Sequence, residues 1–380
     1  MAGGAGNGGW IAAAIAAVRD VEQHAGLGDR AMPHRHHLWT GRTAIADTLL
    51  RRPGIRWGEQ PFWLRYVGLY ASRGRVDRLV PRRLQFLKTG VHADLLSFKT
   101  QIRGFYCDRT VTFKVSRPGS GMSSRNVANE AAIRLRLKDT DRVGVPAMQV
   151  HGAIGSGYFI VEELFADRET MTHRGRLPTD AGGALFDFYR ANEFALVPLN
   201  GVMDAGRELA MLDAHARNLG FVVPDGTVAF VQREILGGAR AQASVMRSLL
   251  HGDLTPTNML GAQQRLYLLD WEHGDIGMTF SDIARLCSVD EEVERRFLGA
   301  ADDWAAKGKI SMMTPSRQLL LGAIVGVNRR IARGDQGGAA DRTPESKRAY
   351  RRKAERYMGL IARILRRERL VGAGAAPNGR

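Results

Sequence analysis

The chain has 380 residues, with 55 Lys and Arg against 39 Asp and Glu, which leaves a net charge of +16. This length predicts two or three compact units, each with a core of its own. Two distant cysteines, Cys107 and Cys287, argue against a disulfide scaffold or a zinc site and favour a reducing compartment. The positive charge indicates an anionic neighbour, such as nucleotide phosphates, an acidic glycan, a membrane surface or nucleic acid, and it counts mildly against a polycationic substrate.

Residues 1–80 are expected to form an N-terminal helical extension, to which the sequence assigns no chemistry. The apolar run at residues 10–18 lacks a basic start and soon meets charged residues, so it predicts a surface or packed helix rather than a signal peptide. No apolar run approaches the ~20 residues that span a bilayer. These features favour a cytoplasmic protein, and the positive charge leaves open a peripheral place at the inner membrane face.

The next segment, residues 81–165, has the alternating pattern and turn signals of a small sheet. Gly155, Ser156 and Gly157 predict a hairpin turn before its last strand. Strands are predicted over residues 84–87, 95–100, 111–115 and 158–164.

A helix is predicted after the third of these strands, which carries Lys114 near its end. Ser123 or Ser124 is the expected N-cap, and Glu130 lies at least one turn into the helix. The plainer interpretation makes Lys114 a surface charge and Glu130 an i,i+4 partner of Arg134.

Residues 166–371 are expected to be mainly helical, with one helix near residues 182–196 and a flexible tail at residues 372–380. Residues 213–234 predict a loop followed by a β-hairpin, which would be either an insertion or a contribution to a pocket. Near the C-terminus a basic helix carries one apolar stripe, which suits either an anionic membrane or the helix's own domain. The stripe consists of Tyr350, Ala354, Tyr357, Ile361 and Ile364.

The most informative stretch runs from His251 to Asn258, with the sequence HGDLTPTN, and is followed by Asp270. Residues 261–264 predict a turn and residues 266–269 a buried strand. A loop, a hairpin and a strand end would therefore bring Asp253, Asn258 and Asp270 together. Phosphoryl transfer from ATP needs such a trio, with one carboxylate to orient or deprotonate the attacking hydroxyl and an Asn and an Asp to hold Mg²⁺.

These two segments, HGDLTPTN and LLDWEHGD, resemble the catalytic loop and metal-binding segment of the aminoglycoside phosphotransferase and choline kinase-like family. The resemblance implies an α+β, bilobal protein-kinase-like fold, with an N-lobe at residues 81–165 and a C-lobe at residues 166–371. It also implies ATP and Mg²⁺ as cofactors. Asp253 would be the catalytic base, and Asn258 and Asp270 would be the metal ligands.

Other roles follow from the same resemblance. Lys114 would contact the nucleotide phosphates and Glu130 would position it. His251 and Asp282 would support the catalytic loop. Gly90 is the only glycine where a phosphate-covering loop would lie, which departs from the glycine-rich pattern of protein kinases. Backbone groups near Glu163 and Leu164 would contact the adenine.

The resulting prediction is an ATP- and Mg-dependent phosphotransferase acting on a hydroxyl of a small molecule or a glycan. One alternative is a pseudokinase or scaffold, and another is a kinase-fold protein whose basic surface binds an anionic membrane or glycan. Nucleic acid is not an expected partner, because no interleaved aromatic platform accompanies the basic residues. Glu272 and Asp275 would face either a second metal or the acceptor, and the acceptor's identity stays open.

Overall fold

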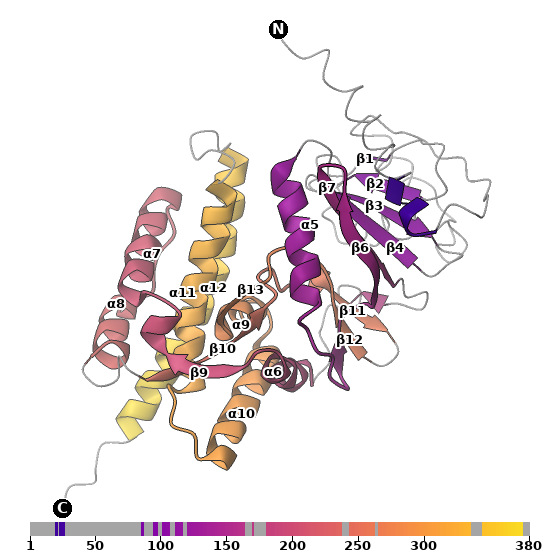
Figure 1. Ribbon diagram of the computed structural model, residues 1–380. Helices are drawn as coiled ribbons and strands as arrows, with labels where there is room; N and C mark the ends of the chain where they lie inside the picture. The colour runs from indigo at the N-terminus through magenta and orange to yellow at the C-terminus, as the bar shows by residue number, and fades with distance from the viewer. Residues whose placement is uncertain are drawn as a thin grey trace, which may run out of the picture. The chain divides into compact units, whose positions relative to one another are not determined.

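The computed structural model divides the chain into two compact units (Figure 1). The first comprises described residues within Met1–Leu135 and Val145–Glu169 together with Trp271–His273. The second comprises those within Arg136–Gly144, Thr170–Asp270 and Gly274–Arg380. The structure describes residues 20–21, 23–26, 85–86, 94–97, 101–106, 111–116, 120–163, 169–170, 180–237, 243–262, 265–335 and 344–374.

The first unit is built on a six-stranded sheet in which every strand pairs antiparallel with its neighbours. The predicted hairpin is confirmed, because a turn at Gly155 and Ser156 joins the last two strands. The strand at residues 101–106 was missed, because Arg103 and Gly104 interrupt its apolar pattern. The order is β1 (Gln85–Phe86), β2 (Asp94–Ser97), β3 (Gln101–Tyr106), β4 (Val111–Ser116), β7 (Gly157–Glu163) and β6 (Met148–Ile154).

Helix α5 (Gly121–Arg134) packs on this sheet through Val127 and Ala131, which meet Ile160 of β7. The predicted N-cap is wrong, because Ser120 takes that position and its Oγ accepts a hydrogen bond from the backbone N–H of Ser123 at 3.3 Å. Ser120 has extended backbone angles, which suit an N-cap, whereas Ser123 already lies inside the helix.

The second unit holds two small sheets. In one, β10 (Ser244–Leu250) pairs antiparallel with β9 (Ala195–Pro198) and with β13 (Asp275–Met278). In the other, the order within this unit is β5 (Val143–Gly144), β12 (Arg265–Leu268) and β11 (Met259–Ala262). The two-residue strand β8 (Glu169–Thr170) lies where the chain passes from the first unit to the second. β12, paired antiparallel with β11, confirms the buried strand predicted at residues 266–269, whereas Gly261 and Ala262, predicted to lie in a turn, belong to β11, and residues 263–264 lie outside the described residues.

Helices make up the rest of this unit, so the predicted α+β class is confirmed. Helix α11 packs against α9 so closely that a Cβ on Gly322 would lie 2.3 Å from the carbonyl oxygen of Phe280. The helices are α6 (Ala181–Ala191), α7 (Ala205–Leu219), α8 (Thr227–Phe230), α9 (Phe280–Cys287), α10 (Glu291–Gly308), α11 (Pro315–Asp335) and α12 (Pro344–Gly374). Shorter turns lie at Leu199–Gly201, Val231–Ile235 and Pro256–Asn258.

One secondary-structure prediction in this unit is wrong, and another, a helix that α6 confirms, was expected to end too late. The hairpin expected within residues 213–234 is helical, because Gly226, with φ +80°, begins α8 instead of turning a hairpin, and the hydroxyl of Thr227 donates to the carbonyl of Pro224 at 2.6 Å. The helix expected over residues 182–196 ends at Ala191. Asn192 is extended there, and its Nδ2 donates to the carbonyl of Phe188 at 2.8 Å.

The apolar stripe near the C-terminus lies on α12, which packs against α7, α9 and α11. Ala354, Tyr357, Ile361 and Ile364 are all buried. The stripe therefore forms part of this unit's core rather than a surface for lipid. Among the described residues, no helix is both long and apolar enough to cross a membrane.

Candidate active site

The loop after β10 begins with His251, whose side chain is fully buried. Its Nε2 lies 2.6 Å from the carbonyl oxygen of Leu269, and its Nδ1 lies 3.3 Å from the backbone nitrogen of Asp253. The neutral tautomer with its proton on Nε2 satisfies both contacts, by donating to Leu269 and accepting from Asp253. The ring thus joins the loop to the end of β12, directly before Asp270.

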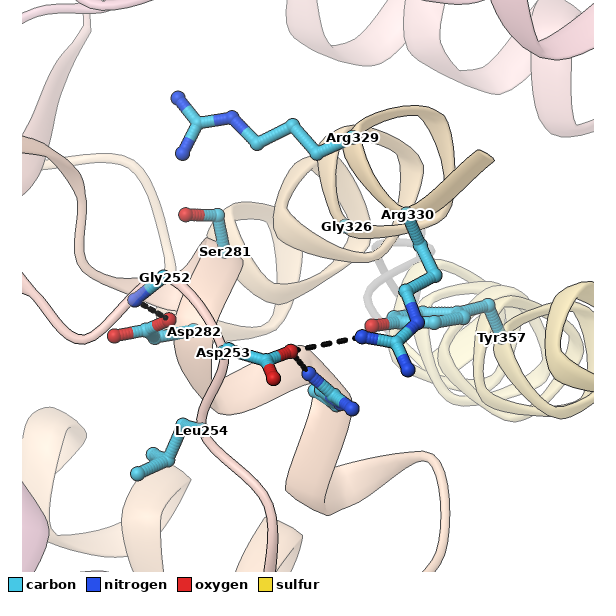
Figure 2. A pocket seen from close by; sticks show the side chains of 10 residues that line it. Gly252, Asp253, Leu254, Ser281, Asp282, Gly326, Arg329, Arg330 and Tyr357 are labelled. Carbon is cyan, nitrogen blue, oxygen red and sulfur yellow. Dashed lines mark hydrogen bonds and ion pairs between the residues drawn. The ribbon is translucent and has the colours of Figure 1, made fainter. Parts of the chain in front are cut away.

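Asp282, near the start of α9, also holds this loop, and Figure 2 shows its carboxylate bonded to Gly252. Its carboxylate accepts hydrogen bonds from the backbone N–H of His251 and, at 2.9 Å, from that of Gly252. A third bond, of 2.9 Å, comes from the hydroxyl of Tyr189. Burial, with the neighbouring charge of Asp282, raises the pKa of Tyr189 well above its usual value, so this hydroxyl keeps its proton and stays a donor.

Tyr189 is a supporting residue that sequence reasoning missed. It lies on α6, far from the motif in the chain, and nothing in the neighbouring sequence distinguishes it from an ordinary core aromatic residue. Gly252 also has a structural reason for its place in the motif. Its φ is +74°, a value that glycine adopts without the steric cost met by other residues.

Asn258 connects the loop to the strand end that carries Asp270. Its Nδ2 donates to the carbonyl of Asp253 at 2.9 Å, and its own carbonyl accepts from the backbone N–H of Leu269 at 2.9 Å. Asp270 follows directly and has φ +70°, which is uncommon for a residue other than glycine. Strained residues of this kind cluster at functional sites, where the surrounding structure holds them in place.

Asp253 is paired with two arginines. Its Oδ1 forms ion pairs with the guanidinium groups of Arg285, from α9, and Arg330, from α11, the latter at 2.8 Å. About a quarter of the Asp253 side chain is exposed, so the pairing is partly shielded from water. Both arginines were missed by sequence reasoning, because the motif contains neither of them.

The predicted Lys114–Glu130 pair is present inside the first unit. The Lys114 ammonium and the Glu130 carboxylate form an ion pair in which both side chains are almost fully buried. Glu130 also lies 3.5 Å from Arg134, which in turn pairs with Glu162. Lys114 is therefore not a surface charge, and the i,i+4 contact exists alongside the pair instead of replacing it.

Several other predicted positions have less distinctive surroundings. The backbone N–H of Glu163 donates to the carbonyl of Ala147 at 2.9 Å, so this donor is already used. Gly90 and Leu164 lie outside the described residues. Glu272 lies 3.5 Å from His273, and its carbonyl accepts a 3.3 Å bond from the side chain of Asn129 on α5. Asp275 is exposed and accepts from the backbone N–H of the next residue.

The chemistry of Asn258 and Asp270 suits Mg²⁺. An amide oxygen and a carboxylate are hard donors, and Mg²⁺ commonly takes only one or two protein ligands and completes its shell with water and substrate phosphates. The nitrogen of the Asn258 amide is occupied by Asp253, which orients the group so that its oxygen is the remaining ligand atom. Within the described residues, no group of three or more His, Cys, Asp or Glu could hold a metal by itself.

Comparisons with solved structures return kinases of small molecules. A choline/ethanolamine kinase family protein from Mesorhizobium loti has 17% identity and a TM-score of 0.40, covering 79% of this chain and 97% of its own. A choline kinase from Streptococcus pneumoniae has 17% identity and a TM-score of 0.41, covering 73% and 94%. A thermostable mutant of an aminoglycoside phosphotransferase has 15% identity and a TM-score of 0.39, covering 77% and 95%.

A search of the curated proteins finds no significant match. A scan against protein families, in contrast, matches residues 106–312 to the phosphotransferase enzyme family. This range spans more than half of the 380 residues and includes Lys114, the His251–Asn258 loop and Asp270. The chain therefore belongs to the phosphotransferase enzyme family, as its two motifs predicted.

Proposed function

We propose that this protein is an ATP- and Mg-dependent phosphotransferase that moves the γ-phosphoryl group to a hydroxyl of a small molecule or glycan. The observation that carries the proposal is the braced loop of the second unit. His251 and Asp282 fix its backbone, and Asn258 ties the residue expected to receive the proton to the strand end carrying Asp270. Family membership supports the same reaction class.

In this proposal Asp253 orients the acceptor hydroxyl and takes its proton as the oxygen attacks the γ-phosphorus. Asn258 and Asp270 hold Mg²⁺, which when bound neutralises charge on the transferring phosphoryl group. Lys114 is assigned to the nucleotide phosphates, and Glu130 keeps its ammonium in one position within the first unit. Catalysis here would rest on positioning and charge rather than on a covalent enzyme intermediate.

The runner-up is a pseudokinase or scaffold that binds ligands without transferring phosphate. One observation favours it: two arginines pair with Oδ1 of Asp253, the carboxylate proposed to receive the hydroxyl proton. A cytoplasmic location and peripheral contact with an anionic membrane also remain predictions, drawn from the cysteine content and the net charge of +16. Salt-sensitive binding to anionic vesicles would support the membrane contact.

The test is transfer from γ-labelled ATP with Mg²⁺ to a panel of hydroxylated metabolites and glycans. We expect a labelled product from the wild type and its loss in Asp253→Asn and Asp270→Ala. The matched control is Asp303→Asn, which makes the same chemical change at an exposed position of α10. Wild-type turnover in both site variants, at wild-type folding by circular dichroism, would refute the assigned roles, and ligand binding without turnover would favour the scaffold.

A further inference from the structure

A chain of buried charges joins helix α5 to the sheet within the first unit. The helix packs on Ile160 of β7 through Val127 and Ala131. Glu130 and Arg134 follow these two helix positions by three residues each, so they lie on the same face of the helix. Both side chains are buried. This face of α5 therefore presents a carboxylate and a guanidinium to the sheet, as well as apolar side chains.

The sheet supplies the two opposite charges. Lys114 of β4 lies across from Ile160 of β7, and Glu162 lies two residues further along β7. Side chains alternate between the two faces of a sheet, so these three side chains point toward α5. Lys114 pairs with Glu130, and Glu162 pairs with Arg134. Two cations and two anions are thus buried together, and their charges balance.

Arg134 connects the two ion pairs. Its Nη1 forms the pair with Glu162 and lies 3.5 Å from Oε1 of Glu130, while its Nη2 donates to the carbonyl of Pro146. Among the described residues, Oε1 of Glu130 is buried without a hydrogen-bond donor, and the guanidinium supplies the compensating charge. A planar guanidinium can serve several acceptors at fixed angles, whereas a lysine ammonium is a single point charge.

This arrangement divides the charge of Glu130 between two cations. The Lys114 ammonium is held in place, but it does not face the whole charge of the carboxylate. Without the guanidinium of Arg134, that whole charge would fall on Lys114, and an anionic ligand of the ammonium would meet stronger competition. Glu162 in turn keeps Arg134 from closing on Glu130, because its carboxylate is the nearer of the two.

Resting on the proposed function, we infer that Arg134 and Glu162 are positioning residues for the nucleotide phosphates. Neither residue touches the nucleotide. Both act through Glu130, which fixes the ammonium of Lys114 while sharing its charge with Arg134. Loss of the Arg134–Glu162 pair therefore weakens the contribution of the phosphates to binding and leaves the contribution of the adenosine part unchanged.

The first experiment compares ATP with adenosine, each titrated calorimetrically in the presence of Mg²⁺. The ratio of the dissociation constant of adenosine to that of ATP measures what the phosphates contribute. The variant combines Arg134→Gln with Glu162→Gln, which removes one cation and one anion and leaves no buried charge unpaired. We expect the ratio to fall about tenfold, the effect of weakening one hydrogen bond to a charged group. Adenosine binding should match wild type, because the backbone near Glu163 is held by its own 2.9 Å bond to Ala147.

The matched control combines Arg351→Gln with Glu355→Gln, which makes the same two changes at an exposed ion pair of α12 in the second unit. It should bind both ligands as wild type does. An unchanged ratio in the buried double variant, or an equal fall in the control, would overturn the inference. If the buried double variant does not fold, Arg134→Lys is measured instead. Its single ammonium cannot reach both carboxylates and the Pro146 carbonyl, so the ratio should still fall.

A second experiment tests whether the effect passes through Lys114. The background combines Lys114→Met with Glu130→Gln, which again removes one cation and one anion and takes away the ammonium proposed to bind the phosphates. Adding Arg134→Gln and Glu162→Gln to this background should change the ratio by less than about twofold, whereas additive losses would overturn the inference. A wild type that binds ATP no more tightly than adenosine would overturn the role of Lys114 in the proposed function, and this inference with it.

Discussion

Asp282→Asn tests how the Asp282 carboxylate supports the His251–Asn258 loop, with the smallest available change of side-chain shape. The wild-type carboxylate is 4% exposed and accepts from three donors, with the N–H of His251 and the hydroxyl of Tyr189 on Oδ2 and the N–H of Gly252 on Oδ1. An amide has only one accepting oxygen. Whichever way it turns, its NH₂ group must face at least one of these donors.

The magnitude follows from that count. Each hydrogen bond to a charged group contributes about 1.5–3 kcal/mol, and a buried donor left unsatisfied costs about 1–3 kcal/mol. If the Asn oxygen replaces Oδ2, the N–H of Gly252 loses its acceptor and the other two bonds become neutral and weaker. We therefore expect Asp282→Asn to lower the free energy of unfolding by about 2–4 kcal/mol. Tyr189→Phe removes one donor and leaves the carboxylate in place, so its loss should be smaller, about 1–2 kcal/mol.

The measurement is urea unfolding followed by far-ultraviolet circular dichroism, with the midpoint and the slope fitted separately. Phosphotransfer should fall further than stability alone explains, because the loop that positions Asp253 loses one of its two supports. If the free energy of unfolding of Asp282→Asn lies within about 0.5 kcal/mol of wild type, the spread of an ordinary surface substitution, the Asp282 carboxylate does not support the loop. A loss in Tyr189→Phe as large as that in Asp282→Asn would also contradict the hydrogen-bond count.

Three further predictions test other parts of the molecule. Gly322→Ala places a Cβ 2.3 Å from a backbone oxygen of α9 and should lower the free energy of unfolding in urea by about 1–3 kcal/mol. The control Gly299→Ala, whose Cβ would lie in open space on α10, should leave that free energy unchanged or raise it by up to about 1 kcal/mol. Lys114→Met leaves the buried carboxylate of Glu130 without its ammonium partner and should lower the free energy of unfolding by about 3–5 kcal/mol, measured in the same way. A loss below about 1 kcal/mol would show that the pair is dispensable for stability. Complete burial raises the pKa of the Cys287 thiol well above its usual value. In a Cys107→Ser background, a thiol reagent at about pH 8 should therefore label Cys287 only after unfolding. Rapid labelling of the native protein would contradict this burial.

The sequence revealed those parts of the site whose spacing is local. The HGDLTPTN loop, the hairpin after it and Asp270 lie within twenty residues, so turn and strand signals suffice to predict that they meet. Lys114 and Glu130 lie sixteen residues apart, on a strand and the helix that follows it. Their pairing follows from one strand-to-helix connection.

The supporting residues that the sequence did not predict make contacts between elements that are distant in the chain. Tyr189 lies 93 residues from Asp282, and Arg330 lies 77 residues from Asp253. Both contacts depend on how α6, α9 and α11 pack, and helix packing leaves no periodic signal at the contacting residue. The hairpin wrongly predicted within residues 213–234 has a local cause. An Asp-Gly pair is typical of a hairpin turn, but here Gly226, with φ +80°, is the N-cap residue of helix α8.

The same reasoning explains why the acceptor cannot be read from the loop motif alone. In the proposed function the motif residues serve the phosphoryl-transfer step, whereas the residues that would distinguish acceptors lie on helices packed around the loop. Here those helices place Arg285 and Arg330 at Asp253. The net charge of +16 indicates an anionic neighbour without locating it, and Arg285 and Arg330 place part of that charge directly beside the proposed base. Acceptor specificity in this protein is therefore expected to follow the packing of α9 against α11 and to change when that packing is disturbed.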